Sequence, residues 1–133
     1  MAVCGMSHKF RQGRRVDAMA RRLALDPMRK LRNVPTECDG IMFHSKKEAG
    51  RYGELRMLER SGIISALELQ KRFDLRVNGV LVCQYIADFA YLDQQGREVV
   101  EDVKGYRGGA TYAVYRLKSK LMIACLGLRV VEI

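Results

Sequence analysis

Closely spaced cysteines are what this 133-residue chain most plainly lacks. It has four cysteines, but no C-x-x-C pair and no short Cys/His cluster of the kind that binds zinc. The cysteines are Cys4, Cys38, Cys83 and Cys125. Widely spaced, reduced thiols are typical of cytoplasmic proteins, so we expect the cytoplasm as the location and no structural zinc.

Long apolar runs are also absent. The first residues are apolar but are interrupted by Gly5, Ser7 and His8, so they lack the continuous hydrophobic segment of a signal peptide. No later segment approaches the roughly 20 apolar residues that a membrane-spanning helix needs. We therefore expect no membrane partner.

Acidic residues are too few to balance the basic ones. The chain has 24 Lys/Arg and 15 Asp/Glu, a net charge of +9. Residues 1–35 hold nine bases and two acids, a net +7, whereas residues 36–133 hold fifteen bases and thirteen acids, a net +2. A basic segment suits DNA, because each neutralised phosphate releases counterions; a merely solubilising surface is the alternative. The arginines expected to contact DNA are Arg14, Arg15, Arg21 and Arg22.

The basic segment is predicted to be an arm that is separate from a compact domain. Residues 14–25 carry apolar side chains at helical spacing, which predicts an amphipathic helix. Pro27 and Pro35 bracket an irregular stretch after it. We therefore divide the chain into a basic N-terminal helical arm, residues 1–35, and one domain, residues 36–133.

The domain is expected to begin with a short strand at residues 41–43 and a helix over residues 46–61. Ser45 and Glu48 have the capping-box spacing, in which a hydroxyl and a carboxylate bind exposed amides of the first turn. At about 100° per residue, Glu48 also lies in the middle of the apolar stripe that contains Tyr52. A carboxylate is thus predicted to point toward the core.

Three extended runs follow, at residues 73–77, 80–92 and 98–104. The Asn78-Gly79 dipeptide between the first two indicates a two-residue hairpin turn. Together the runs predict a meander of three antiparallel strands.

A second helix over residues 112–126 and a last strand over residues 128–133 complete the predicted domain. The apolar stripe of this helix is expected to be Val114, Leu117, Leu121 and Ala124. A strand that returns through a helix is parallel to its neighbour. The predicted fold class is therefore α/β, with a mixed central sheet flanked by helices.

The third strand carries a D-x-K run. A two-residue period places Asp102 and Lys104 on one face and Glu101 on the other. Asp88 lies in an apolar run typical of a central strand, where an unpaired carboxylate is costly and a shared cation would offset the cost. The plain alternatives are an Asp88–Lys104 ion pair, an edge position for Asp102, and a capping role alone for Glu48.

These residues, in this order of elements, resemble the PD-(D/E)XK nuclease superfamily, whose restriction-endonuclease-like core runs α-β-β-β-α-β. The likeness covers about residues 36–133 and rests on Glu48, Asp88 and the Asp102-Val103-Lys104 run. The same segments resemble a small phage-encoded family of that superfamily, described only as a domain of unknown function. The chain departs from the commonest pattern in having Asp at position 102 and no proline before Asp88; the superfamily accepts both variations.

The resemblance implies a role for each of these residues. Asp88, Asp102 and the Val103 carbonyl would bind a metal ion, with Glu48 binding directly or through water. Lys104 would orient the attacking water and stabilise developing negative charge. Hard oxygen ligands favour Mg²⁺, with Mn²⁺ as a substitute. No small-molecule organic cofactor is expected.

Other residues are candidates for DNA contact rather than chemistry. Two lysines at the start of the first helix would suit a phosphate, and a glutamine next to the first strand is expected near the site. The loop after Lys104 would touch the backbone or stack on an unpaired base. These candidates are Lys46, Lys47, Gln70, Tyr106 and Arg107, and ordinary surface positions are the alternative.

The function that these expectations favour is a Mg²⁺-dependent DNA endonuclease acting on branched or structured DNA, in the manner of Holliday junction-resolving enzymes. For a phage-encoded chain the location would be the host cytoplasm. Two coordinated cuts would require a homodimer. The alternatives are a non-catalytic DNA-binding or anti-defence protein on a nuclease scaffold, and a sequence-specific restriction-type nuclease.

Overall fold

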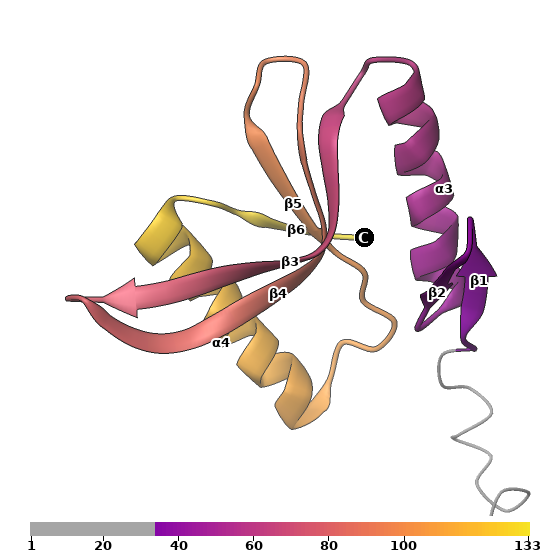
Figure 1. Cartoon of the computed structure of the whole chain (residues 1–133). Helices are drawn as coiled ribbons and strands as arrows, with labels where there is room; N and C mark the ends of the chain where they lie inside the picture. Colours follow the sequence, from indigo (N-terminus) through magenta and orange to yellow (C-terminus); the bar gives the residue numbers. More distant parts are fainter. Residues whose placement is uncertain (1–33) are drawn as a thin grey trace, which may run out of the picture. The chain divides into compact units, whose positions relative to one another are not determined.

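The computed structural model describes residues 34–133, so the arm helix predicted at residues 14–25 and its arginines lie outside the described residues. Figure 1 shows the described part as a sheet with a helix near each of its faces. Its elements are β1 (Thr36–Cys38), β2 (Ile41–Phe43), α3 (Lys46–Arg60), β3 (Ser65–Val77), β4 (Val80–Leu92), β5 (Glu98–Asp102), α4 (Gly109–Leu126) and β6 (Val130–Glu132).

The central sheet has four strands in the order β3-β4-β5-β6. The first three strands pair antiparallel, and β6 pairs parallel to β5, so the predicted mixed α/β sheet is confirmed. Asn78 and Gly79 have φ of 50° and 77°, which is the left-handed geometry of the predicted two-residue hairpin turn. The order of elements after residue 45 is the predicted one.

Two strand boundaries differ from the prediction. Strand β3 begins at Ser65 instead of residue 73, so Gln70 lies inside the strand. Ala66 and Gln70 have positive φ, which interrupts the regular alternation of side chains between the two faces and hides the strand in the sequence. Strand β5 ends at Asp102, so Lys104 follows the strand instead of lying in it. The Lys104 N–H still donates to the Ile133 carbonyl at 3.2 Å, which keeps this segment alongside the end of β6.

A small hairpin precedes α3. Strand β2 was predicted, but its partner β1 was not, because three residues with no clear alternation carry little pattern. The two strands pair antiparallel, with Thr36 opposite Phe43 and Cys38 opposite Ile41. Phe43 is buried and its ring lies 4.9 Å from that of Tyr52, so the hairpin packs on α3.

Helix α3 presents the predicted face to the sheet. The Ser45 hydroxyl accepts a hydrogen bond from the Glu48 N–H at 3.1 Å, which caps the helix. The residues that the helix buries are Glu48, Ala49, Tyr52 and Leu55. The position of Glu48 within the apolar stripe is therefore confirmed.

Two apolar clusters lie on opposite faces of the sheet. The first, the α4 cluster, joins α4 to strands β3 to β6 and contains Phe73, Leu75, Tyr85, Ala87, Ala90, Val100, Tyr115, Met122 and Val130. The second, the α3 cluster, joins α3 and the small hairpin to the sheet and contains Phe43, Ala49, Tyr52, Leu55, Ile64, Phe89 and Val103. The sheet is thus covered from both sides, as predicted.

The buried side of α4 differs from the predicted stripe. Val114 and Leu117 are 52% and 61% exposed, whereas Tyr115 and Met122 are buried. Apolar side chains occur around most of this helix, so its pattern alone did not decide which side packs on the sheet. Among residues 34–133, no helix combines the length and the apolar character needed to cross a membrane.

Candidate functional site

Asp102 and Lys104 lie side by side at the end of β5. The Lys104 Nζ is 2.9 Å from Asp102 Oδ1, and only 8% of the Asp102 side chain is exposed. Asp102 faces the α4 side with Lys104, while Glu101 and Val103 face α3, which agrees with the two-residue period. Because β5 lies between β4 and β6, the alternative of an edge position for Asp102 is wrong.

Two tyrosines complete the surroundings of this pair. The Tyr85 hydroxyl donates a hydrogen bond to Asp102 Oδ2. Burial, followed by that bond to a carboxylate, raises the pKa of Tyr85 well above its usual range, so its hydroxyl stays a donor. The Lys104 Nζ lies 3.9 Å from the centre of the Tyr115 ring, within cation–π range. Lys104 is therefore held above α4 and beside Asp102, with 22% of its side chain exposed.

The regular alternation of side chains between the two faces of the sheet is interrupted at Asp88 in strand β4. Upstream, Ala87 belongs to the α4 cluster; downstream, Phe89 belongs to the α3 cluster, although a regular strand would place both on one face. On the neighbouring strand, Gln70 falls opposite Asp88 in the β3–β4 register and has a φ of 51°. Such a φ in a residue other than glycine marks a local break in a strand. Because of this break, the Asp88 side chain lies between the α3 face and the α4 face of the sheet.

The Asp88 carboxylate is anchored on both sides. Its Oδ2 accepts from the Val103 N–H at 2.8 Å, and its Oδ1 accepts from Gln70 Nε2 at 3.1 Å. Burial raises the pKa of Asp88 to about 6 despite the Val103 bond, and the negative charges of Asp102 and Glu48 add to the increase. Asp88 is therefore close enough to both other carboxylates to interact with their charges.

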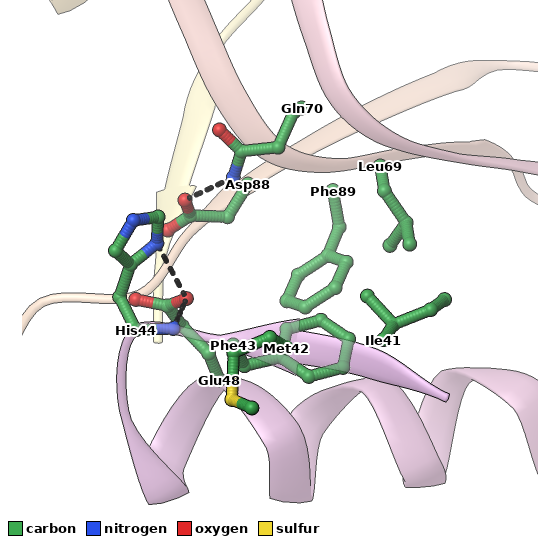
Figure 2. Close-up of a pocket in the computed structure, with 9 residues that line it drawn as sticks. All are labelled: Ile41, Met42, Phe43, His44, Glu48, Leu69, Gln70, Asp88 and Phe89. Carbon is green, nitrogen blue, oxygen red and sulfur yellow. Dashed lines mark hydrogen bonds and ion pairs between the residues drawn. The ribbon is translucent and has the colours of Figure 1, made fainter. Parts of the chain in front are cut away.

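Glu48 approaches from α3. Its Oε2 accepts from the His44 N–H at 3.2 Å and lies 3.8 Å from His44 Nδ1. The carboxylate thus bonds to the residue before Ser45 instead of completing the predicted capping box on Ser45 itself. Figure 2 shows the Glu48 and Asp88 carboxylates on the same side of the pocket, with the His44 ring beside them.

A cavity of about 100 Å³ opens beside these two carboxylates. Polar groups from Glu48, Asp88, His44 and Gln70 form one side. Figure 2 shows apolar side chains on the other side. These apolar residues come from the small hairpin and from strands β3 and β4: Ile41, Met42, Phe43, Leu69 and Phe89.

The donor set has the chemistry for Mg²⁺, because three carboxylates and the Val103 carbonyl offer hard oxygen atoms. However, among residues 34–133 no three Asp, Glu, His or Cys side chains are arranged closely enough to hold an ion as they stand. The Lys104 ammonium, 2.9 Å from Asp102 Oδ1, already neutralises one of the expected ligands.

The residues predicted to contact DNA are distributed around this site. Lys47 Nζ donates to the carbonyls of Lys104 at 3.0 Å and of Ile133 at 2.7 Å, so its ammonium already has oxygen partners, whereas Lys46 is exposed. Gln70 lies at the site through its bond to Asp88. The loop after Lys104 is exposed.

Within that loop, Tyr106 is 81% exposed, and Arg107 pairs with Glu132 at 3.2 Å. The DNA contacts predicted for these residues stay predictions.

Sequence reasoning missed three participants. His44 received no role, yet it lines the cavity and binds Glu48. Neither Tyr85 nor Tyr115 was named from the sequence, although Tyr85 contacts Asp102 and Tyr115 contacts Lys104. For Tyr85 a signal existed, because a tyrosine on a buried strand needs a partner for its hydroxyl. For the others no local signal existed.

The chain was compared with known protein families, curated proteins and solved structures. Residues 28–125 match a family described as "Protein of unknown function (DUF1064)". The chain belongs to the DUF1064 family. No curated protein and no solved structure matches it. The region matched in this DUF1064 protein includes Glu48, Asp88, Asp102 and Lys104, so the whole candidate site belongs to the family's own domain.

Proposed function

We propose that this DUF1064 protein is a Mg²⁺-dependent endonuclease that hydrolyses phosphodiester bonds of branched or structured DNA. One observation carries the proposal. The Asp88 carboxylate accepts a hydrogen bond from the Val103 N–H, and burial together with the negative charges of Asp102 and Glu48 raises its pKa. Lys104 is paired to Asp102 two residues away. Negative charges of this kind, gathered beside one lysine, are typical of a site that binds a hard cation.

Each residue of the site would have its own role in the reaction. Asp88, Asp102, Glu48 and the Val103 carbonyl would hold the ion, and Mn²⁺ would substitute for Mg²⁺. A bound Mg²⁺ polarises the phosphodiester and lowers the pKa of a bound water. Lys104 would place its ammonium against the developing negative charge. Tyr85 would keep Asp102 oriented.

The cavity supports a nucleic-acid substrate. A nucleotide has an anionic phosphate and an apolar base face, and the cavity joins carboxylates that would hold a cation to an apolar wall. Met42, on the small hairpin, is 63% exposed at this wall. The base or sugar beside the scissile phosphate would lie against it, which favours DNA whose bases are locally unstacked.

A junction-resolving enzyme makes two coordinated cuts, so a homodimer belongs to the proposal. The basic arm, with a net charge of +7 over residues 1–35, would add a salt-dependent contact to the DNA backbone.

A non-catalytic DNA-binding or anti-defence protein is the second candidate. It is favoured by the same Lys104–Asp102 pair, which neutralises one of the expected ligands. In that case the lysine would act as a permanent replacement for the cation, and DNA binding would not depend on Mg²⁺.

A cleavage assay separates the two candidates. The purified chain is offered four-way junction, flap, single-stranded and linear duplex DNA, with Mg²⁺ and with a chelator. The proposal predicts Mg²⁺-dependent cutting of the junction or flap. Cutting of linear duplex at one sequence would instead indicate a restriction-type enzyme, and Mg²⁺-independent binding without any cutting would indicate the non-catalytic candidate.

A further inference from the structure

An ion pair between Arg51 and the buried carboxylate of Glu101 joins helix α3 to β5 next to the candidate site. Arg51 Nη2 donates to Glu101 Oε1 at 2.7 Å, and Arg51 Nε donates to Glu101 Oε2 at 2.8 Å. The Glu101 side chain is only 2% exposed. The bond to Glu101 raises the pKa of Arg51, and two parallel bonds of this kind also fix the orientation of the two groups.

A third hydrogen-bond donor also binds the Glu101 carboxylate. The Tyr91 hydroxyl donates to Glu101 Oε1 at 2.6 Å. Burial and the bond to Glu101 raise the pKa of Tyr91 to about 12, so the hydroxyl stays protonated at neutral pH. Glu101 is therefore satisfied by donors from α3 and from β4, and these two elements are joined through β5.

A second attachment lies one turn earlier on α3. Lys47 Nζ donates to the main-chain oxygen atoms of Lys104 and Ile133. Lys47 and Arg51 are four residues apart, so they lie on the same side of the helix. They contact residues on either side of Asp102 in the chain, namely Glu101 and Lys104.

Glu48 lies between these two attachments. It is the residue after Lys47 and three before Arg51, and its carboxylate is the only site ligand that we assign to α3. Asp88 and Asp102, in contrast, are carried by the sheet. The distance between Glu48 and the other two carboxylates therefore depends on how α3 is placed along β5.

We infer that Arg51, aided by Lys47, is a positioning residue: it sets the position of α3 on β5 and so places Glu48 for binding of the divalent cation. The inference rests on the proposed function and adds to it a residue that need not touch DNA, cation or the reacting atoms. Partners that orient the ligands of a metal commonly change its affinity by about 10- to 100-fold when they are removed.

The test uses Arg51→Lys, which keeps the charge but cannot form the two parallel bonds. In the full chain we expect the Mg²⁺ concentration for half-maximal cleavage of the four-way junction to rise about 10-fold or more. The matched control is Glu54→Ala. Glu54 is a second partner of Arg51, at 2.7 Å and 66% exposed, and it belongs to α3 itself. This control should leave the Mg²⁺ dependence unchanged.

A double variant separates positioning from a general loss of structure. If Arg51 acts through Glu48, then Arg51→Lys should have almost no further effect in a Glu48→Gln background. An equal effect in both backgrounds, or an unchanged Mg²⁺ requirement in Arg51→Lys, would overturn the inference. Thermal unfolding of each variant shows which fraction is folded.

Mn²⁺ binding without DNA, measured by calorimetry, keeps the two proposals distinguishable. If the wild type cuts no DNA but binds Mn²⁺, and Arg51→Lys weakens that binding by about 10-fold or more, the nuclease fails and the positioning role stands. If the wild type cuts DNA and Arg51→Lys behaves like it, the positioning role alone fails. If the wild type neither cuts DNA nor binds Mn²⁺, both proposals are wrong.

Discussion

Two neighbouring carboxylates, Glu101 and Asp102, face opposite sides of the sheet and have different surroundings. Glu101 faces α3, is 2% exposed, and has a planar arginine bound to both of its oxygen atoms. Asp102 faces the α4 side and bonds to Tyr85 and to a single lysine ammonium. A lysine bonded to one oxygen can be displaced by a cation, whereas an arginine that forms two bonds to a buried carboxylate cannot be displaced easily.

The different partners of these two acids suit them to separate roles. Glu101 joins α3 to β5, and Asp102 is the acid that we propose as a ligand of the cation. Asp102 also contributes to the repulsion that raises the pKa of Asp88, and groups held in unfavourable charge environments are typical of functional sites.

The largest expected effect separates the two acids by activity. Asp102→Asn should reduce Mg²⁺-dependent cleavage by far more than the roughly 100-fold that loss of a supporting partner costs, because a ligand of the cation is removed. Its unfolding temperature should change little, because loss of the repulsion between Asp102 and Asp88 offsets loss of the ion pair between Asp102 and Lys104. Cleavage kinetics and thermal unfolding measure both. Wild-type cleavage by Asp102→Asn would contradict the assigned role.

The second prediction concerns stability. Glu101→Gln should lower the free energy of unfolding by about 3 kcal/mol, the lower end of the range for broken buried ion pairs, because Arg51 is 23% exposed and retains some hydration. Urea unfolding followed by circular dichroism measures the change. Glu54→Gln, which alters the exposed partner of the same arginine, should change it by no more than about 0.5 kcal/mol. Equal effects of the two substitutions would remove the distinction between Glu101 and its surface neighbour.

The third prediction tests the lysine beside Asp102. Lys104→Ala should reduce the maximal cleavage rate by about 100-fold, as loss of one group that stabilises developing charge commonly does. The Mg²⁺ requirement should not increase, since the ammonium competes with the cation for Asp102. Rates measured over a range of Mg²⁺ concentrations separate the two quantities. A raised Mg²⁺ requirement with an unchanged maximal rate would contradict this division.

The smallest effect is a pH dependence in the absence of metal. The folded-state pKa of Asp88, about 6, lies above its ordinary value of 3.8. The stability linked to this group is therefore fully present below pH 3.8 and is lost as the pH rises through about 6. With a chelator present, the unfolding temperature should fall by a few degrees across this interval. Asp88→Asn should flatten the profile, and an unchanged slope would show that another group is responsible.

Much of the framework could be predicted because its signals are local. The capping serine, the Asn78-Gly79 turn and the long apolar run of β4 each follow from neighbouring residues. The burial of Glu48 also followed from helical spacing. The buried side of α4 did not, because Val114 and Leu117 are as apolar as the residues that pack, and only contact with the sheet selects between them.

The site shows the same division. Alternation along β5 placed Asp102 and Lys104 together, but the partners of the pair, Tyr85 and Tyr115, come from other elements. The change of face at Asp88 depends on Gln70 across the sheet, and no pattern within β4 indicates it.

By itself, the sequence determined the order of the elements after residue 45, the mixed α/β sheet and the faces on which neighbouring acids lie, because helical and strand periods depend only on local geometry. Only the tertiary structure decided which acid is closed by an arginine and which stays beside a lysine. It also placed Asp88 between the two faces and joined α3, the helix that carries Glu48, to β5 through Arg51. These outcomes depend on contacts between residues far apart in the chain, where packing and burial, not local spacing, select the partner.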